Sequence, residues 1–263
     1  MKRVCALTIA KNEKYFLPIW VEYYGCQIGF ENLYIIDNGT TDGSIDELYK
    51  MGVNIIYKES EFEYDVEWMT EEIRRLQKDL LRSYDITIHS DADEIIIANP
   101  EKYECLIDFL LCVNRNDVCR CKGYEVLHLR GVEEPLDWNK PILVSQRKYW
   151  IFLESYCKPS IASRHVDWVL GRHFEYGEKN YPKDENLYLL HLHRVDFNVC
   201  RQITKVKREN TGRWSPGRRS EYNPNTLPDD DFIRYFDTPH HPLQWCPVHS
   251  CMTLIPESFK DII

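Results

Sequence analysis

Residues 85–98 read DITIHSDADEIIIA, two apolar segments with a group of acids between them. The first segment is typical of a short buried strand, and strand character resumes after the acids. In extended chain, alternation would place Asp91 and Asp93 on one face, with a small residue between them. Two acids in an exposed loop are usually solvated, but carboxylates between buried strands cost free energy unless they have a partner. The stretch therefore favours a bound cation or ligand at a strand end.

The chain before this stretch alternates between apolar runs and helical patterns. Strands are predicted at residues 4–10, 32–37, 53–57 and 85–89, and helices at 15–25, from a cap within 41–44 through residue 49, and at 66–83. This order predicts an α/β fold with a mixed, mainly parallel sheet flanked by helices. Ligands bind beyond the carboxyl ends of such strands. We therefore expect Asn12-Glu13, Asp37-Asn38 and Asp91/Asp93 to converge on one crevice.

The pattern becomes less regular after residue 100. It predicts a helix at 103–113, two short strands within 117–129, strands at 143–152, 167–174 and 187–195, a basic helix at 201–209 and a mobile loop at 211–228.

Net charge and hydropathy exclude several classes of protein. The 263 residues carry a formal net charge of −9, whereas a general nucleic-acid binder needs a basic excess, so we expect no nucleic-acid partner. No stretch approaches the roughly 18 apolar residues of a membrane span. The apolar run at 4–10 is too short for a signal peptide, so we expect a cytoplasmic protein whose ten cysteines are reduced.

A metal site is one way to use the paired carboxylates. Carboxylate oxygens are the ligands that hard divalent cations prefer. No GxGxxG or Walker lysine motif is present, so a bound nucleotide would need a metal to neutralise its phosphates. His191 and His193 alternate onto one face of their predicted strand, and either could complete a mixed O/N site suited to Mn²⁺ or Mg²⁺. We favour His191, and the alternative is a hydrogen-bonded histidine pair in a half-buried strand.

Several ordered motifs resemble those of GT-A glycosyltransferases, most closely families 2 and 92 (the domain-of-unknown-function 23 group). In the first hundred residues they are Ala10-Lys11-Asn12-Glu13, Pro18 to Tyr24, Ile36 to Ser44 and His89 to Glu94. Fragments of the second half of that group are Lys158-Pro159, Gly171-Arg172-His173 and His191-Leu192-His193-Arg194. The resemblance covers roughly residues 4 to 200.

The resemblance implies a Rossmann-like GT-A domain at 1–200, with a nucleotide-sugar half at 1–100 and an acceptor half at 101–200. It implies an irregular extension at 201–263 packed on the same domain. The implied activity moves a sugar from a nucleoside diphosphate sugar, by family habit a UDP-sugar, to a hydroxyl of a glycan or other glycoconjugate. A bound Mn²⁺ or Mg²⁺ would stabilise the departing diphosphate in an inverting displacement.

Donor contacts are carried over from the resemblance residue by residue. The nucleoside pocket would be lined by Ala10, Asn12 and Glu13, and Asp37 would contact the base or ribose with Asn38 beside it. The ribose and the metal would be held by Asp91 and Asp93, and His191 would be the distal metal ligand. Asp93 is the stronger metal candidate of the two carboxylates. Arg75 is a weaker candidate for a base or phosphate contact, and a solvated helix face is the alternative for it.

An inverting transfer also needs a general base on the later strands. Asp167 and Glu175 are the candidates, near Trp168 and Phe174, which could stack on sugar faces. Both acids could equally lie on the surface, which leaves the stereochemistry open.

The main basic concentration consists of Arg201, Lys205, Lys207, Arg208, Arg213, Arg218 and Arg219. Three interpretations are open: a lid over the diphosphate, a patch for a membrane surface or an anionic acceptor, or a solvated face. The main rival function is a catalytically degenerate GT-A-like module that binds a glycan or nucleotide. Two other enzyme classes fit the sequence less well. A sugar-1-phosphate nucleotidyltransferase would need a Gly-rich basic loop after the first strand, which the sequence lacks. A metal phosphohydrolase would usually need more clustered acids and histidines than the sequence contains.

Overall fold

The computed structural model describes residues 2–62, 64–177, 182–209, 229–237 and 251–263. The chain divides into two compact units. The first unit comprises residues 1–60, 66–123 and 154–190, and the second comprises 61–65, 124–153 and 191–263. These limits do not coincide with the predicted boundary after residue 200, which stays a prediction.

A mixed, mainly parallel sheet forms the first unit, as the sequence predicts. Strand β1 (Val4–Ala10) pairs in parallel with β2 (Leu33–Asp37) and with β4 (Ile86–His89), and β2 pairs in parallel with β3 (Asn54–Tyr57). Strand β8 (Pro159–Ala162) adds to β4 in the antiparallel sense. Every residue of β1 and β4 is buried, as expected for strands covered on both faces.

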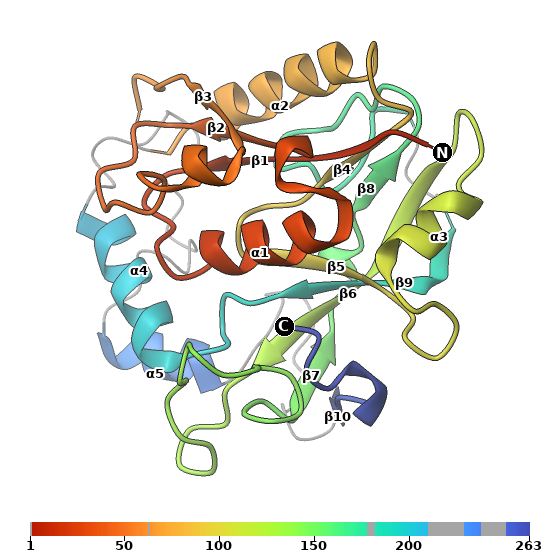
Figure 1. The fold of residues 1–263 in the computed structure, drawn as a ribbon. Helices are drawn as coiled ribbons and strands as arrows, with labels where there is room; N and C mark the ends of the chain where they lie inside the picture. Colours follow the sequence, from red (N-terminus) through yellow and green to blue (C-terminus); the bar gives the residue numbers. More distant parts are fainter. Residues whose placement is uncertain (1, 63, 178–181, 210–228, 238–250) are drawn as a thin grey trace. The chain divides into compact units, whose positions relative to one another are not determined.

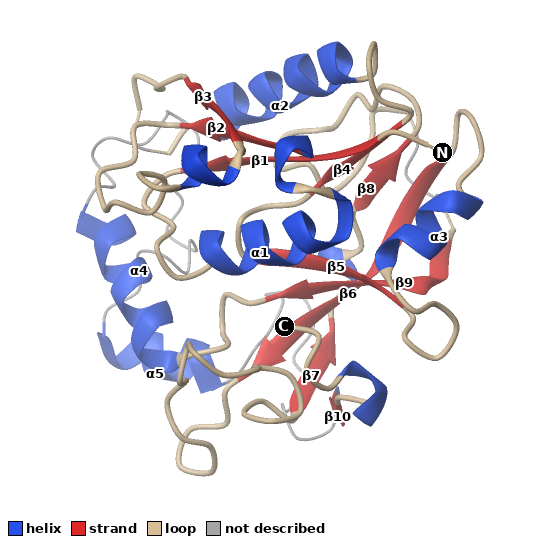
Figure 2. Cartoon of the chain, viewed as in Figure 1, coloured by secondary structure: helices blue, strands red, loops and turns tan. Residues whose placement is uncertain are grey.

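Helices flank this sheet. They are α1 (Leu17–Ile28), α2 (Val66–Leu80) and α3 (Leu106–Cys112) (Figure 2). The same unit contains the short 3-10 turns η1 (Phe30–Asn32), η2 (Leu48–Met51) and η3 (Glu154–Tyr156). Ile73 and Leu80 of α2 pack in one apolar cluster with Cys5, Leu7 and Ile9 of β1. Because these β1 residues alternate along the strand, α2 covers one face of the sheet.

Three further strands contribute to the first unit. Strand β5 (Glu94–Ala98) follows β4 after a turn and pairs with β9 (Lys183–His191). The start of β6 (Val118–Leu127) pairs with β8.

The second unit contains the end of β6 paired antiparallel with β7 (Tyr149–Phe152), and β7 pairs with β10 (Met252–Leu254). Helices α4 (Phe197–Glu209) and α5 (Asp229–Asp237) and the turn η6 (Glu257–Phe259) belong to the same unit. Cys200, Phe232 and Phe236 form the apolar cluster between α4 and α5. Within the described residues, no helix combines the length and apolar character needed to cross a bilayer.

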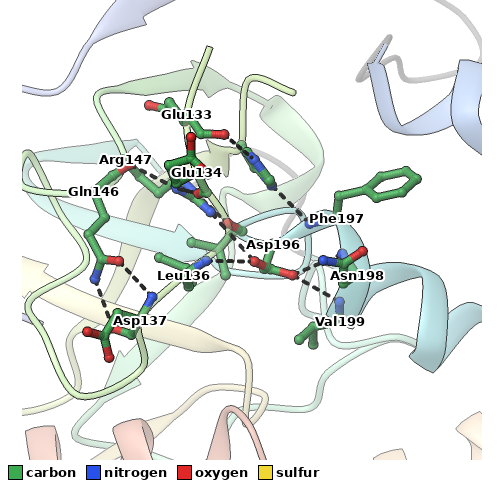
Figure 3. A network of polar contacts seen from close by, with 12 residues as sticks. Glu133, Glu134, Leu136, Asp137, Gln146, Arg147, Asp196, Phe197, Asn198 and Val199 are labelled. Carbon is green, nitrogen blue, oxygen red and sulfur yellow. Dashed lines mark hydrogen bonds and ion pairs between the residues drawn. The ribbon is translucent and has the colours of Figure 1, made fainter. Parts of the chain in front are cut away.

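Asp196 begins helix α4 in the second unit (Figure 3). Its carboxylate accepts the backbone N–H of Asn198 (2.9 Å) and of Val199 (3.1 Å), two donors that a helix start otherwise leaves unsatisfied. The other oxygen accepts the N–H of Leu136 at 2.9 Å and lies 3.7 Å from the fully buried Arg147 guanidinium. One buried carboxylate therefore serves as a helix cap and as the counter-charge of a buried arginine.

An Asp196→Ala variant should lose about 3 kcal/mol of unfolding free energy, since it removes the cap and leaves Arg147 buried without its carboxylate. Asp196→Asn is the matched comparison, because an amide oxygen still caps the helix but carries no charge. Urea unfolding of both variants should show a smaller loss for the amide. Equal stability of Asp196→Ala and the parent protein would contradict this assignment.

The structure corrects several predicted elements in the loops. The caps at 41–44 begin no α-helix, because Gly43 has a positive φ of 81° and the N–H of Ser44 turns back to the Asp42 carboxylate at 3.0 Å. Residues 143–148 form a turn in which Val144 has φ 64°, so the predicted strand is limited to 149–152. Residues 117–129 hold one strand with a register irregularity after Cys119, where two strands are predicted.

Two predicted strands near the candidate site also differ. Residues 167–176 form a tight hairpin with a single bridge between Trp168 and Glu175, because Gly171 and Arg172 both adopt positive φ values, 84° and 63°. Strand β9 starts earlier than predicted and ends at His191. His193 lies in the following turn, yet its ring still stacks on that of His191, with centroids 5.8 Å apart.

Candidate functional site

The carboxyl ends of three neighbouring parallel strands form the candidate site. Strand β1 lies between β4 and β2, with Ala10 opposite Asp37 and Leu7 opposite His89. The chain that leaves each strand therefore emerges at the same edge of the sheet (Figure 1). The first unit thus brings the three predicted polar pairs to one edge.

The loops after β1 and β2 are bonded to each other through Asn12. This residue has a positive φ of 57°, a conformation that asparagine tolerates better than most residues. Its side-chain oxygen accepts the N–H of Thr41 (2.7 Å) and of Asp42 (3.1 Å). The Glu13 carbonyl accepts the N–H of Phe16 and of Leu17, which starts helix α1.

Asp37 and Asn38 order the loops at the end of β2. Asp37 is 5% exposed, and its carboxylate accepts the N–H of Thr40 at 2.8 Å. Asn38 donates its N–H to the Ala10 carbonyl (2.9 Å) and accepts that of Ser60 (2.7 Å) through its side chain. Asn12, Asp37 and Asn38 therefore shape the backbone at this edge.

Aromatic side chains of α1 hold the turn after β4. The Trp20 indole N–H donates to the Ser90 hydroxyl at 2.9 Å, and the Tyr24 hydroxyl lies 3.3 Å from the same oxygen. The Tyr24 hydroxyl also accepts the N–H of Ile96 in β5 at 2.9 Å. Burial raises the pKa of Tyr24, so it stays a neutral hydrogen-bonding group. Helix α1 therefore fixes both sides of the acidic turn.

Asp91 lies in this turn between two cationic side chains. Its two oxygens accept from Lys158 Nζ at 2.9 Å and from an Arg172 guanidinium nitrogen at 2.6 Å. Lys158 also contacts Glu94 at 2.5 Å, and both of those side chains are almost fully buried. The N–H of Glu94 donates to the Asp91 carbonyl at 2.9 Å, so the two motif carboxylates lie in a turn rather than in the predicted extended chain.

The charges of this cluster stabilise one another. Burial would raise the pKa of Asp91, but Arg172 and Lys158 outweigh it and hold that pKa well below its usual value. For Lys158, burial acts to lower the pKa, yet Asp91 and Glu94 raise it above its usual value. Asp91 and Lys158 are therefore both charged at neutral pH, and removal of either leaves an uncompensated charge on the other.

Two buried histidines lie beside this cluster. Burial, followed by the nearby Arg172, lowers the pKa of His89 to about 3, and its ring centroid is 5.0 Å from that of Trp168. Burial and Lys158 lower the pKa of His173 to about 4, and its ring bonds to the Ser155 carbonyl. Both rings are neutral at pH 7.

Acidification should destabilise the first unit before the carboxylates titrate. Both folded pKa values lie below the usual value of about 6.5, so the stability they contribute is complete above pH 6.5 and declines below it. Each histidine should lower the free energy of unfolding by up to about 1.4 kcal/mol for each pH unit below 6.5. Urea unfolding at pH 7.5, 6.5 and 5.5 should show this slope, and His173→Asn should reduce it by about half, because His89 still contributes. A flat profile in the parent protein would contradict the prediction.

The two base candidates both lie in ion pairs. Asp167 is exposed and contacts the Arg74 guanidinium at 3.1 Å. Glu175 is buried and accepts both terminal nitrogens of Arg164, at 2.6 and 2.9 Å. Each carboxylate is therefore already engaged by an arginine side chain, and both assignments as the general base stay predictions.

The aromatic side chains near these acids differ in exposure. Trp168 is 1% exposed and donates its indole N–H to the Pro159 carbonyl, so it packs in the core and cannot stack on a sugar. Phe174 remains partly exposed, and the Arg120 guanidinium lies over its ring at 5.5 Å.

Arg75 on α2 contacts Glu72 at 2.6 Å, one turn earlier on the same helix, and its side chain is largely exposed. That arrangement fits the solvated helix face better than a donor contact.

His191 belongs to the second unit and is oriented by a buried carboxylate. Its Nδ1 lies 2.9 Å from the Glu125 carboxylate, whose second oxygen accepts the N–H of Arg194 at 3.1 Å. Burial would raise the pKa of Glu125, but His191 outweighs it and the net shift is downward. A carboxylate on Nδ1 is the usual support of a metal-binding histidine, which would then bind through Nε2. The metal role of His191 and His193 stays a prediction.

The described residues do not form a ready metal site. Both oxygens of Asp91 accept hydrogen bonds from cationic side chains, and its role as a metal ligand stays a prediction. In the described part of the chain, no three His, Cys, Asp or Glu side chains come together in a way that could hold an ion. Asp93 is the other carboxylate of the motif, in the same turn.

Lys158 and Arg172 are site residues that sequence reasoning did not assign. Their signal was present in the Lys158-Pro159 and Gly171-Arg172-His173 fragments, which carried the resemblance but no role. The structure brings both fragments to Asp91 across 67 and 81 residues of sequence. In the basic concentration, Arg213, Arg218 and Arg219 lie outside the described residues, as does the predicted loop at 211–228.

No family model and no curated protein matches this chain. Among solved structures, it is similar to glucosyl-3-phosphoglycerate synthase from Mycobacterium tuberculosis in complex with phosphoglyceric acid, with 18% sequence identity, a TM-score of 0.32, and 50% of this chain and 45% of that chain covered. It is also similar to the complex of that enzyme with Mn²⁺ and uridine-diphosphate-glucose, with 17% identity, a TM-score of 0.31, and 47% and 44% covered. The similarity spans less than half the length of these structures. Membership of families 2 and 92 remains a prediction.

Proposed function

We propose that this protein is a glycosyltransferase that moves a sugar from a nucleoside diphosphate sugar to a hydroxyl acceptor. The observation that supports it most is the single edge at which β4, β1 and β2 end side by side. At that edge lie Asn12, Asp37, Asn38, Asp91 and Asp93. In open α/β sheets this edge is where ligands bind.

The electrostatics of the edge support an anionic donor. Lys158 and Arg172 offset the charge of Asp91 and Glu94, so a diphosphate would not face an uncompensated acidic cluster. We assign to Asp91 the role of holding these cations and to Asp93 the contact with the donor. We also propose that the activity requires Mn²⁺ or Mg²⁺.

A binding module without catalysis is the second candidate. It is favoured by the ion pairs of Asp167 and Glu175, because a transferase needs a carboxylate or histidine that can accept the proton of the acceptor hydroxyl. A module of this kind would bind a nucleotide or glycan at the same edge and release no product.

Donor binding and turnover are measured in parallel to separate these functions. The protein is mixed with UDP, GDP, CDP or TDP, with Mn²⁺ or with EDTA, and its Tm is recorded. A ligand at 100 times its Kd adds about 2.7 kcal/mol, a rise of roughly 5–10 °C for a chain of this size. Label transfer or donor hydrolysis is then followed with sugars of the responding nucleotide. A shift with turnover supports the transferase, and a shift without turnover supports a nucleotide-binding module. The absence of a shift with any nucleotide contradicts the transferase and leaves a glycan-binding module as the alternative.

A further inference from the structure

A cavity lies at the opposite edge of the same sheet, in the first unit. Its volume is about 610 Å³, in the range of small-molecule sites. Lys2 precedes β1, while Asp85 and Ile86 start β4, so the cavity opens at the amino ends of the parallel strands. Strand β1 has seven residues, which places this cavity about 20 Å from the candidate donor edge.

The lining is strongly basic for a chain of net charge −9. It contains Lys2, Lys78, Arg115, Arg164 and His165 and one acid, Asp85. Arg164 is neutralised by Glu175, and Asp85 lies beside Arg3 at 3.8 Å. The cavity therefore carries a net positive charge, which comes from Lys2, Lys78 and Arg115.

Two of these cations are available to a ligand. Lys2 donates to backbone carbonyls at the end of α3, including that of Leu111 at 2.7 Å. Lys78 and Arg115 are exposed, and neither forms an ion pair with another described residue. Burial and then Lys78 lower the pKa of His165, while Asp167 and Glu175 act in the opposite direction without reversing the shift.

Hydrogen bonds hold the residues that line the cavity in place. The N–H of Asn114 donates to the Asp117 carboxylate at 2.7 Å, and this hydrogen bond closes the loop that carries Arg115. Ser163 donates its hydroxyl to the Asn114 carbonyl, also at 2.7 Å. His165 contacts the Gln77 side chain at 3.1 Å, which fixes it against α2, the helix that carries Lys78.

We propose that this cavity binds a small, multiply charged oxyanion, with Lys78 and Arg115 as its charged contacts. The planar guanidinium can take two oxygens of one phosphate or carboxylate group, and the ammonium adds a point charge. Phosphoryl and carboxylate ligands share this chemistry. The site is separate from the donor edge and does not depend on the proposed transferase activity.

Calorimetric titration tests the site directly, without sugar donor and without divalent metal. Pyrophosphate and citrate are titrated separately at low ionic strength, because salt screens exposed charges. Wild type should bind at least one of them, and Lys78→Ala/Arg115→Ala should weaken that Kd at least tenfold. Lys50→Ala/Arg82→Ala is the matched control: it removes two exposed cations that do not line the cavity and should keep the Kd within twofold.

The outcomes are decisive in either direction. Stronger binding of pyrophosphate identifies a phosphoryl ligand, and stronger binding of citrate a carboxylate ligand. Absence of binding by both to wild type overturns the proposal. An unchanged Kd in the cavity variant, which would place the anion at the donor edge, overturns it as well, as does an equal loss in the control variant. Failure of sugar transfer leaves this result unaffected.

Discussion

Asp91→Ala should unfold with about 3 kcal/mol less free energy than the parent protein, a fall in Tm of roughly 6–12 °C. The variant leaves Lys158 and Arg172 in the interior, where they are 4% and 6% exposed, without the carboxylate that both contact. Asp91 itself is 27% exposed, so water compensates part of the loss and the effect stays at the low end for a broken buried pair.

Two comparisons isolate the charge of Asp91 from general effects. Asp79→Ala removes an exposed acid of α2 that is paired with Arg82. This variant should change the free energy of unfolding by no more than about 0.5 kcal/mol. A double-mutant cycle with Lys158→Met should show that the loss from Asp91→Ala is smaller once the lysine is gone. Losses that simply add would mean that the two residues do not act as a pair.

Asp93→Ala should separate activity from stability. If Asp93 contacts the donor, the variant should lose about 100-fold in kcat/KM, equivalent to about 2.7 kcal/mol of transition-state stabilisation. Because Asp91 neutralises two buried cations, Lys158 and Arg172, we expect the Tm of Asp91→Ala to fall further than that of Asp93→Ala. Asp79→Ala again serves as the charge-matched control, with activity expected to be unchanged.

The expected contrast is therefore a folded, inactive Asp93 variant beside a destabilised Asp91 variant. Full activity of a folded Asp93→Ala would remove this residue from the donor site. Loss of nucleotide binding together with turnover would favour a donor contact, whereas loss of turnover alone would assign Asp93 to the chemical step.

The parallel half of the fold was predictable because its signals are local. Strands β1 to β4 are continuous apolar runs, and α2 has apolar residues on one side, so each element is found within a few residues of its predicted place. Their order then dictates which strand ends share an edge. Asn12, Asp37 and Asp91 could therefore be grouped from sequence.

The rest depended on contacts that no local pattern records. The pairing of Asp91 with Lys158 and Arg172 joins segments far apart in the chain, so no pattern around residue 91 could indicate it. The hairpin at 167–176 reads as a strand because its apolar residues alternate, whereas positive φ values at Gly171 and Arg172 bend it. Glu125, the partner of His191, gives no signal within its own strand.

The attachment of α1 to the acidic turn has a consequence for local opening. The N–H of Ile96 is bonded to a tyrosine hydroxyl of the helix, so its exchange with solvent deuterium requires α1 to move away. Helix α1 and the segment from Ser90 to Ile96 should therefore open as one cooperative unit, with matching protection factors, while the loop at 41–47 exchanges independently. Substitution of Trp20 by Phe would lower protection in both segments at once, although they are about 70 residues apart in the chain.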